Sequence, residues 1–255
     1  MPGLLLGHAY PGLLARRDAD ELTRIFQGVG RHDARQIVVR ANTPIFQSAF
    51  LAQGFVGRYR HDGKSRGRLV ALQIPGDFVD LPSFYLGHLD HDLVSLTPTV
   101  LRLAPHSAVE HLHHAAPAVE QALLRIMLME AGIHRYWTYR LSGLRGRARL
   151  ANLFAEIFLR QFSRGLCQGL RCAMPLTQAD IGDACAMTAV HVNRMLGELR
   201  DEGLCTLYNG SLTIHDLAAL IRTGKFDHDY LYLPPDAEAA FAELAAPRRR
   251  PRGRS

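Results

Sequence analysis

One stretch, residues 176–204, constrains the fold more than any other, because it predicts two short amphipathic helices joined by a tight turn. Thr177 is a good N-cap for the first helix, and Asp180 can satisfy the free backbone amides there. Thr188 is the corresponding cap of the second helix. The apolar stripe of that helix follows helical spacing: Val192, Met195, Leu196 and Leu199.

A β-hairpin is predicted directly after these helices. Gly203 fits the position that ends the second helix. Asn209-Gly210 lies between two alternating runs, which is the strongest short-range signal for a hairpin. Helix, turn, helix and hairpin in this order predict a winged DNA-binding head, whose second helix reads the major groove with side chains near its N-terminus.

The polar face of the second helix supplies the candidate DNA contacts. Arg194 is expected to read a base, since arginine is the usual bidentate partner of guanine, and Asn193 and His191 can reach bases or phosphate. Thr177, Gln178, Thr188 and Asn209 are expected to contact the DNA backbone. The full predicted set is Thr177, Gln178, Thr188, Ala189, Val190, His191, Asn193, Arg194 and Asn209.

The stretch IGDACAMTAVHVNRMLGELRDEGL and its hairpin resemble the DNA-binding domain of the Crp/Fnr superfamily of bacterial transcription regulators. The similarity extends upstream through residues 141–161 and, more weakly, through residues 74–101. The resemblance implies an α+β chain with an N-terminal β jelly roll, a long connecting dimerisation helix and a C-terminal winged helix-turn-helix. The domains expected from it are a cyclic-nucleotide-binding-like sensor (15–112), the dimerisation helix (113–144), the DNA-binding domain (145–222) and a C-terminal extension with a basic tail (223–255).

The N-terminal half alternates short apolar runs with Gly- and Pro-containing turns, which is typical of a roll or barrel of short strands. A leading helix is predicted at residues 21–28, and a turn at HDGKSRG. The predicted strands are residues 36–40, 50–60, 68–74, 93–96 and 100–103.

The resemblance also bears on the signal that the roll receives. In cyclic-AMP-responsive members a Gly-Glu-Leu segment holds the ribose and an Arg-Ser pair holds the phosphate. Here these segments read Phe78-Val79-Asp80-Leu81-Pro82 and His91-Asp92. A carboxylate repels a phosphate and the bidentate arginine is missing, so we expect no high-affinity cyclic-AMP binding and no cofactor. The effector stays open.

Two positions in the helix-turn-helix depart from the family pattern. Val190 stands where well-known members carry a glutamate that reads the site, so a different recognition sequence is expected. Ala186 stands where the turn usually has glycine. A left-handed backbone there would cost up to about 1 kcal/mol.

A long helix is predicted at residues 116–144, with no proline after Pro117. About 28 residues span roughly 40 Å, which favours pairing with a second copy as a parallel coiled coil. The expected dimer contacts are Val119, Leu123, Ile126, Ile133 and Trp137. A stripe through Ala122, Ile126, Met129, Ile133 and Tyr136 fits almost as well, and burial of the helix within one subunit is the alternative.

The charge distribution limits the argument for DNA. The formal net charge is +6, but residues 145–247 hold 10 Lys and Arg against 12 Asp and Glu. The tail PRRRPRGRS carries five arginines and is expected to be disordered; whether it contacts phosphate stays open. DNA affinity is therefore expected from local arginines and backbone contacts.

Cysteine and histidine patterns predict neither a metal site nor catalytic residues. The four cysteines, Cys167, Cys172, Cys185 and Cys205, match no zinc spacing. Iron–sulfur sensors of the resembled family hold their cluster with cysteines mainly near the N-terminus, where this chain has none. The crowded groups lack the spacing of a known site: His88, Asp90, His91 and Asp92, then His111, His113 and His114.

The sequence thus predicts a sequence-specific transcription regulator, not an enzyme, that binds double-stranded DNA as a homodimer on a palindromic site. RNA polymerase stays open as a further partner. No apolar run approaches the ~18 residues of a membrane span, so a cytoplasmic, bacterial protein without a membrane partner is expected. Two alternatives remain: a metal-dependent jelly-roll enzyme, and a winged helix that binds protein.

Overall fold

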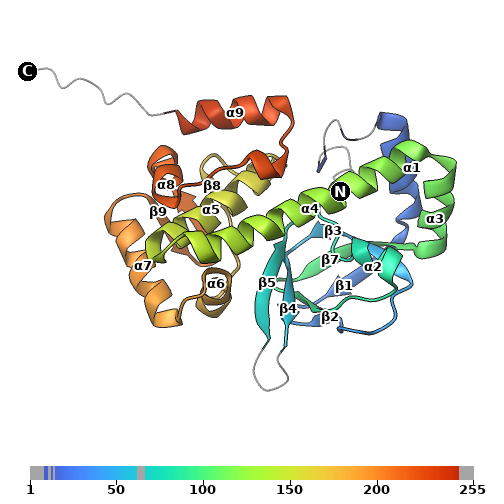
Figure 1. Cartoon of the computed structure of the whole chain (residues 1–255), viewed down its shortest axis with the longest axis horizontal. Helices are drawn as coiled ribbons and strands as arrows, with labels where there is room; N and C mark the ends of the chain where they lie inside the picture. Colours follow the sequence, from blue (N-terminus) through green and yellow to red (C-terminus); the bar gives the residue numbers. More distant parts are fainter. Residues whose placement is uncertain (1–8, 11–12, 14, 62–66, 247–255) are drawn as a thin grey trace, which may run out of the picture.

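A computed structural model describes residues 9–10, 13, 15–61 and 67–246 (Figure 1). It confirms the α+β class, with an N-terminal roll, a long helix and a C-terminal head. The predicted basic tail and most of the HDGKSRG turn lie outside the described residues. In the described part of the chain, no helix is long and apolar enough to cross a membrane.

The roll consists of two antiparallel sheets that pack around an apolar core. One has the order β1-β7-β3, with β1 at Gly28–His32, β7 at Thr99–Pro105 and β3 at Gln47–Gln53. The other has the order β2-β6-β4-β5: Ile37–Val39, Asp92–Ser95, Val56–Arg60 and Arg68–Gln73. Leu51, Val56, Leu93 and Leu101 lie in the core between them.

Several predicted boundaries in the roll are wrong. Residues 50–60 form parts of two strands, because Gly54 has a φ of +86° and a Cβ there would lie 2.4 Å from the Pro98 carbonyl oxygen. The leading helix α1 spans Arg16–Ile25 rather than 21–28, since Gly28 already begins β1. The short helix α2, Leu81–Leu86, was not predicted; Pro82 is tolerated in its first turn.

The long helix α4, Pro117–Gly143, follows α3, His106–Ala115, and runs from the roll to the head (Figure 1). The four predicted dimer contacts Val119, Leu123, Ile126 and Trp137 are buried within their own chain. The first three pack on Leu22 and on the roll. Trp137 belongs to the core of the head, and Ile133, which is half-buried, packs against that core. Four of the five residues thus pack within their own chain, which disfavours a dimer contact through them.

Helix α5, Gly146–Phe162, is the centre of the head, with residues 150–161 all buried. Around it lie β8 (Arg171–Ala173), α6 (Gln178–Cys185), α7 (Ala189–Asp201), β9 (Cys205–Tyr208), β10 (Ser211–Ile214) and α8 (Leu217–Gly224). A short 3-10 helix, Asp229–Leu231, and α9, Pro235–Ala245, follow (Figure 1). Gly224 permits close packing of α8, since a Cβ there would lie 2.6 Å from the Asn152 amide nitrogen.

Buried charges tie α5 to its neighbours. Arg140 of α4 and Glu156 of α5 form an ion pair in which both side chains are 0% exposed. Trp137 Nε1 donates to Glu156 Oε1 at 3.0 Å, and the Tyr230 hydroxyl donates to Glu156 Oε2 at 3.0 Å. Glu156 therefore joins α4, α5 and the segment after the head.

Removing the Glu156 carboxylate would leave the buried Arg140 guanidinium without its ion-pair partner. We expect Glu156→Ala to lower the unfolding free energy by about 3–5 kcal/mol, the usual cost of leaving one partner of a buried ion pair alone. Urea denaturation measures this change, and Glu110→Ala, on an exposed position of α3, is the control. A loss below about 1 kcal/mol for Glu156→Ala would contradict the role assigned to the pair.

Candidate nucleic-acid interface

The first helix of the motif begins at the predicted cap. Thr177 Oγ1 accepts from the Asp180 amide at 3.1 Å, and Asp180 Oδ2 accepts from the Thr177 amide at 3.0 Å. This reciprocal capping box fixes where α6 starts. Ala186 ends the helix with φ 49° and ψ 53°, which confirms the left-handed residue expected in the turn.

Helix α7 presents one polar face to solvent. The Thr188 side chain accepts from the His191 amide at 3.3 Å and so caps the helix as predicted. Val192, Met195 and Leu199 point inward, and the opposite face carries Val190, 81% exposed, and Arg194, whose side chain is 67% exposed. Arg194 has only a long ion pair to Glu198, at 3.9 Å, so its guanidinium is available for a partner.

A pair of amide side chains connects α6 and α7. Gln178 Nε2 donates to Asn193 Oδ1 at 2.5 Å, and Asn193 Nδ2 donates to Gln178 Oε1 at 2.9 Å. Both residues are exposed. The structure thus brings together two predicted contact residues that lie far apart in sequence, and each orients the other.

The wing has the predicted turn. Asn209 and Gly210, with φ of 47° and 70°, join β9 and β10, and Leu207 pairs with Leu212. Tyr208, beside the turn, is 76% exposed. Tyr208 is not among the DNA contacts predicted from the sequence.

The head contacts the roll through α6. Asp180 Oδ2 accepts from Arg35 at 2.9 Å, and Asp180 Oδ1 accepts from the Tyr59 hydroxyl at 2.7 Å. Burial raises the pKa of Asp180, but the hydrogen bonds from Arg35, Tyr59 and Thr177 outweigh it and hold the pKa below its ordinary value. Asp183 accepts from the Leu69 amide at 3.2 Å. Helix α6 therefore lies between the roll and α7, and α7 stays on the outer side (Figure 1).

The segments aligned with the nucleotide-binding residues are occupied by internal contacts. Asp80 Oδ1 accepts from the Ala49 amide at 2.8 Å, and Asp92 Oδ1 accepts from the Ala41 amide at 2.7 Å. His91 Nδ1 lies 2.7 Å from Asp90 Oδ1. Asp80 and Asp92 thus already accept hydrogen bonds from backbone amides of the roll.

The cysteines and histidines form no metal site that the structure reveals. Among the described residues, no group of three or more His, Cys, Asp or Glu is placed to hold a metal ion. Cys185, near the turn of the motif, is buried, and burial raises the pKa of its thiol to about 12.

The comparisons with known proteins agree with this geometry. A family model described as the Crp-like helix-turn-helix domain matches residues 148–223, which include α6, α7 and the wing. Residues 148–223 thus form a Crp-like helix-turn-helix domain, and the chain is a DNA-binding transcription regulator.

Its relatives include the anaerobic regulatory protein of Pasteurella multocida, 22% identical over 83% of this chain and 77% of the relative. The transcriptional activator protein FnrL of Cereibacter sphaeroides is 24% identical over 84% of this chain and 88% of its own length. The solved structure of FixK2 from Bradyrhizobium japonicum has the same fold, with a TM-score of 0.68 and 20% identity over 77% of this chain and 96% of FixK2.

Arg194 provides the sharpest test of the predicted DNA-binding face. We expect Arg194→Ala to weaken binding to its site by about 1–3 kcal/mol and to relax one base position. Binding to the site and to its single-base variants measures both effects. The control is Arg200→Ala, on the same helix, whose guanidinium pairs with Asp201 at 3.1 Å. An equal loss on every sequence would make Arg194 a phosphate contact instead.

Asp80 generates a prediction on pH. Burial raises its pKa to about 7, against the hydrogen bond from Ala49 and the attraction of Arg58. A carboxyl whose pKa is raised on folding stabilises the protein below its unfolded pKa of about 4, and this contribution is lost as the pH rises to 7. Asp80→Asn keeps an acceptor for Ala49, so the variant should gain up to about 4 kcal/mol relative to wild type between pH 4 and 8. Parallel pH profiles of unfolding free energy would contradict this.

Proposed function

We propose that this regulator binds a palindromic DNA site as a homodimer, that it does so without cyclic AMP, and that it carries no catalytic site. The observation that carries the proposal is the solvent-facing side of α7, where Val190, Asn193 and Arg194 are all exposed. A helix so exposed, following a capped helix and a turn, has the geometry that enters a major groove.

Each predicted contact has a distinct chemical use. Arg194 offers a bidentate donor to guanine, and Asn193, oriented by Gln178, offers an amide that matches adenine. Val190 can only pack against a base or a thymine methyl. Thr177, Thr188, Asn209 and the newly found Tyr208 suit contacts with the sugar-phosphate backbone.

We place the dimer contact on the outward face of α4. Leu124 and Leu128 are 50% and 57% exposed, although both are large apolar side chains. The same face continues through Ala131 and Arg135, with steps of four, three and four residues. This is the spacing of a two-stranded coiled coil, and a second copy would cover the exposed leucines.

Independence from cyclic AMP rests on the charges of the roll. Asp90 and Asp92 flank His91, and burial lowers the pKa of His91, so its ring is neutral at pH 7. Arg58 is engaged by Glu130 Oε1 at 2.5 Å, so it is not available to a phosphate. The neighbourhood therefore repels a cyclic phosphate rather than holding it.

Selection of bound DNA from random sequence, with and without cyclic AMP, tests the proposal. We expect the same palindrome in both pools, with half-site centres about one DNA turn, ~34 Å, apart. Sedimentation should show a dimer for wild type and a monomer for Leu124→Glu/Leu128→Glu, with binding weakened at least about tenfold because each half-site is then bound alone.

The matched control is Leu86→Glu, which replaces an equally exposed leucine, 67% exposed, outside α4. It should leave both the dimer and the DNA affinity unchanged. An enriched single half-site, a wild-type monomer at micromolar protein, or a requirement for cyclic AMP would contradict the corresponding part of the proposal.

A further inference from the structure

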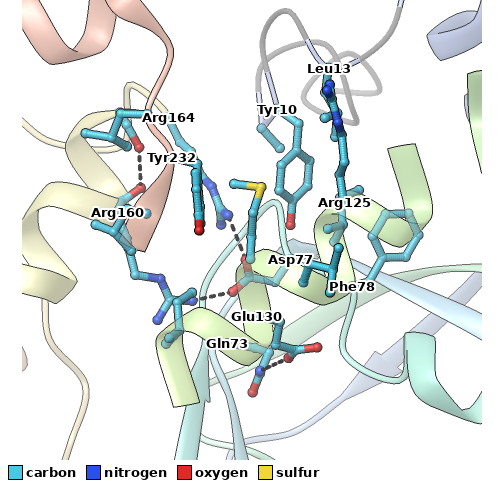
Figure 2. Close-up of a pocket in the computed structure, with 18 of the residues that line it drawn as sticks. Tyr10, Leu13, Gln73, Asp77, Phe78, Arg125, Glu130, Arg160, Arg164 and Tyr232 are labelled. Carbon is cyan, nitrogen blue, oxygen red and sulfur yellow. Dashed lines mark hydrogen bonds and ion pairs between the residues drawn. The ribbon is translucent and has the colours of Figure 1, made fainter. Parts of the chain in front are cut away.

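A cavity of about 740 Å³ lies where four parts of the chain meet: the end of β5 and the turn after it, α4, α5 and the segment 231–235 before α9 (Figure 2). Its volume is in the range of cavities that hold small organic ligands. We propose that it binds an anionic amphiphile, a molecule with a carboxylate on an apolar body. This inference goes beyond the proposed function, because binding here requires no DNA.

The walls of the cavity suit an apolar body. They are formed mainly by aliphatic and aromatic side chains from the roll, α4 and the segment after the head: Leu72, Phe78, Ile126, Met129, Leu231 and Leu233. Tyr232, in a left-handed conformation with φ 48°, closes one side, opposite Tyr10 (Figure 2). Burial of a ligand's apolar part against these groups provides affinity without selecting a charge.

The charges of the lining select an anion. Asp77 forms ion pairs with two arginines, Arg160 at 2.8 Å and Arg164 at 2.7 Å. Glu130 forms an ion pair with Arg58, which does not line the cavity. Arg125 and Arg135 also line the cavity and form no ion pair with any other described residue. The lining therefore carries a net positive charge, which an anionic ligand would balance.

His134 adds no further positive charge to this lining. Burial, and then the nearby Arg58 and Arg160, lower the pKa of His134 to about 4, so its ring is neutral at pH 7. A cationic or zwitterionic ligand is thus disfavoured by the four arginines, whereas a carboxylate meets Arg125 without having to displace Asp77 or Glu130 from their partners.

Two buried polar atoms in the lining have no hydrogen-bond partner among the described residues. They are Arg160 Nε and Gln73 Oε1, on side chains that are 5% and 3% exposed. An unpaired buried donor or acceptor costs about 1–3 kcal/mol. Of the two, Arg160 Nε is a donor, which suits a carboxylate, whereas Gln73 Oε1 is an acceptor. Both residues line the same cavity as Asp77 (Figure 2).

The position of the cavity gives its ligand a means to act on DNA binding. Gln73 and Asp77 belong to the roll, Arg160 to α5 and Arg164 to the turn directly after it. Leu233 belongs to a segment beyond residue 223, where the helix-turn-helix model ends. A ligand that contacts all three parts stabilises the arrangement in which the head is docked on the roll. This second step rests on the proposed function, whereas ligand binding itself does not.

Calorimetry on the full chain tests the site with three probes: decanoate, decanamide and acetate. We expect decanoate to bind at least tenfold more tightly than decanamide, which has the same apolar body without the charge, and acetate to show no measurable binding. Arg125→Gln should weaken decanoate at least tenfold and leave decanamide unchanged. Arg24→Gln, an exposed arginine of α1 away from the cavity, is the matched control and should change neither.

A second variant and a control keep the result interpretable. Tyr232→Asp, at an exposed position whose φ of 48° suits aspartate, places a carboxylate in the wall and should also weaken decanoate. Sedimentation of Arg125→Gln should match wild type, since the substitution leaves the exposed Leu124 and Leu128 in place. Equal binding of decanoate and decanamide, or decanoate binding unaltered in both variants, would overturn the proposal.

The effect of the ligand on DNA binding is measured in a separate experiment. With the selected palindrome, saturating decanoate should change the DNA affinity of wild type at least threefold and that of Tyr232→Asp by less. A chain that binds decanoate but no palindrome would overturn the proposed function and leave the ligand site standing. A chain that binds its palindrome but no decanoate would overturn the ligand site alone.

Discussion

The relative position of roll, long helix and head depends on two charges of α5, Glu156 and Arg160. They lie one turn apart, and each faces a different partner: Glu156 pairs with Arg140 of α4, and Arg160 pairs with Asp77 of the roll. All four side chains are buried. Burying an unpaired charge costs several kcal/mol. Separating either pair would therefore expose the charged side chains to solvent or leave one of them buried without a partner. The pairs thus specify one arrangement more than they stabilise it.

Asp180 extends this dependence to the DNA-binding motif. The same carboxylate that completes the capping box of α6 also accepts hydrogen bonds from Arg35 and Tyr59 of the roll. The start of α6 is therefore fixed by the roll as well as by its own sequence. Among the described residues, α7 makes no such hydrogen bond to the roll, so the side chains predicted to read bases stay exposed while α6 beneath them is held.

The sequence predicted best what depends on interactions within a few residues. The caps at Thr177 and Thr188, the Asn209-Gly210 turn and the left-handed Ala186 are all confirmed, because each is a local backbone requirement. The predicted dimer stripe illustrates the opposite case. Helix α4 has apolar side chains on two faces, Val119 to Trp137 inward and Leu124 with Leu128 outward, and periodicity alone cannot tell which face meets its own chain.

The cavity lay beyond sequence reasoning because no motif contains it. Gln73, Arg125, Arg160 and Tyr232 come from four separate segments, and only the packing of α5 brings them together. The extension after the head is part of this packing, since Tyr230 stacks on Tyr136 of α4 with ring centroids 3.9 Å apart and donates to Glu156. A movement of the head about the junction between α4 and α5 would have to break these contacts. Helix α5 thus contacts the roll through Asp77, the extension through Tyr230, and the DNA-binding motif through packing on α6 and α7. A ligand bound between the roll and the extension would therefore act on the DNA-binding motif through α5, without contacting the motif itself.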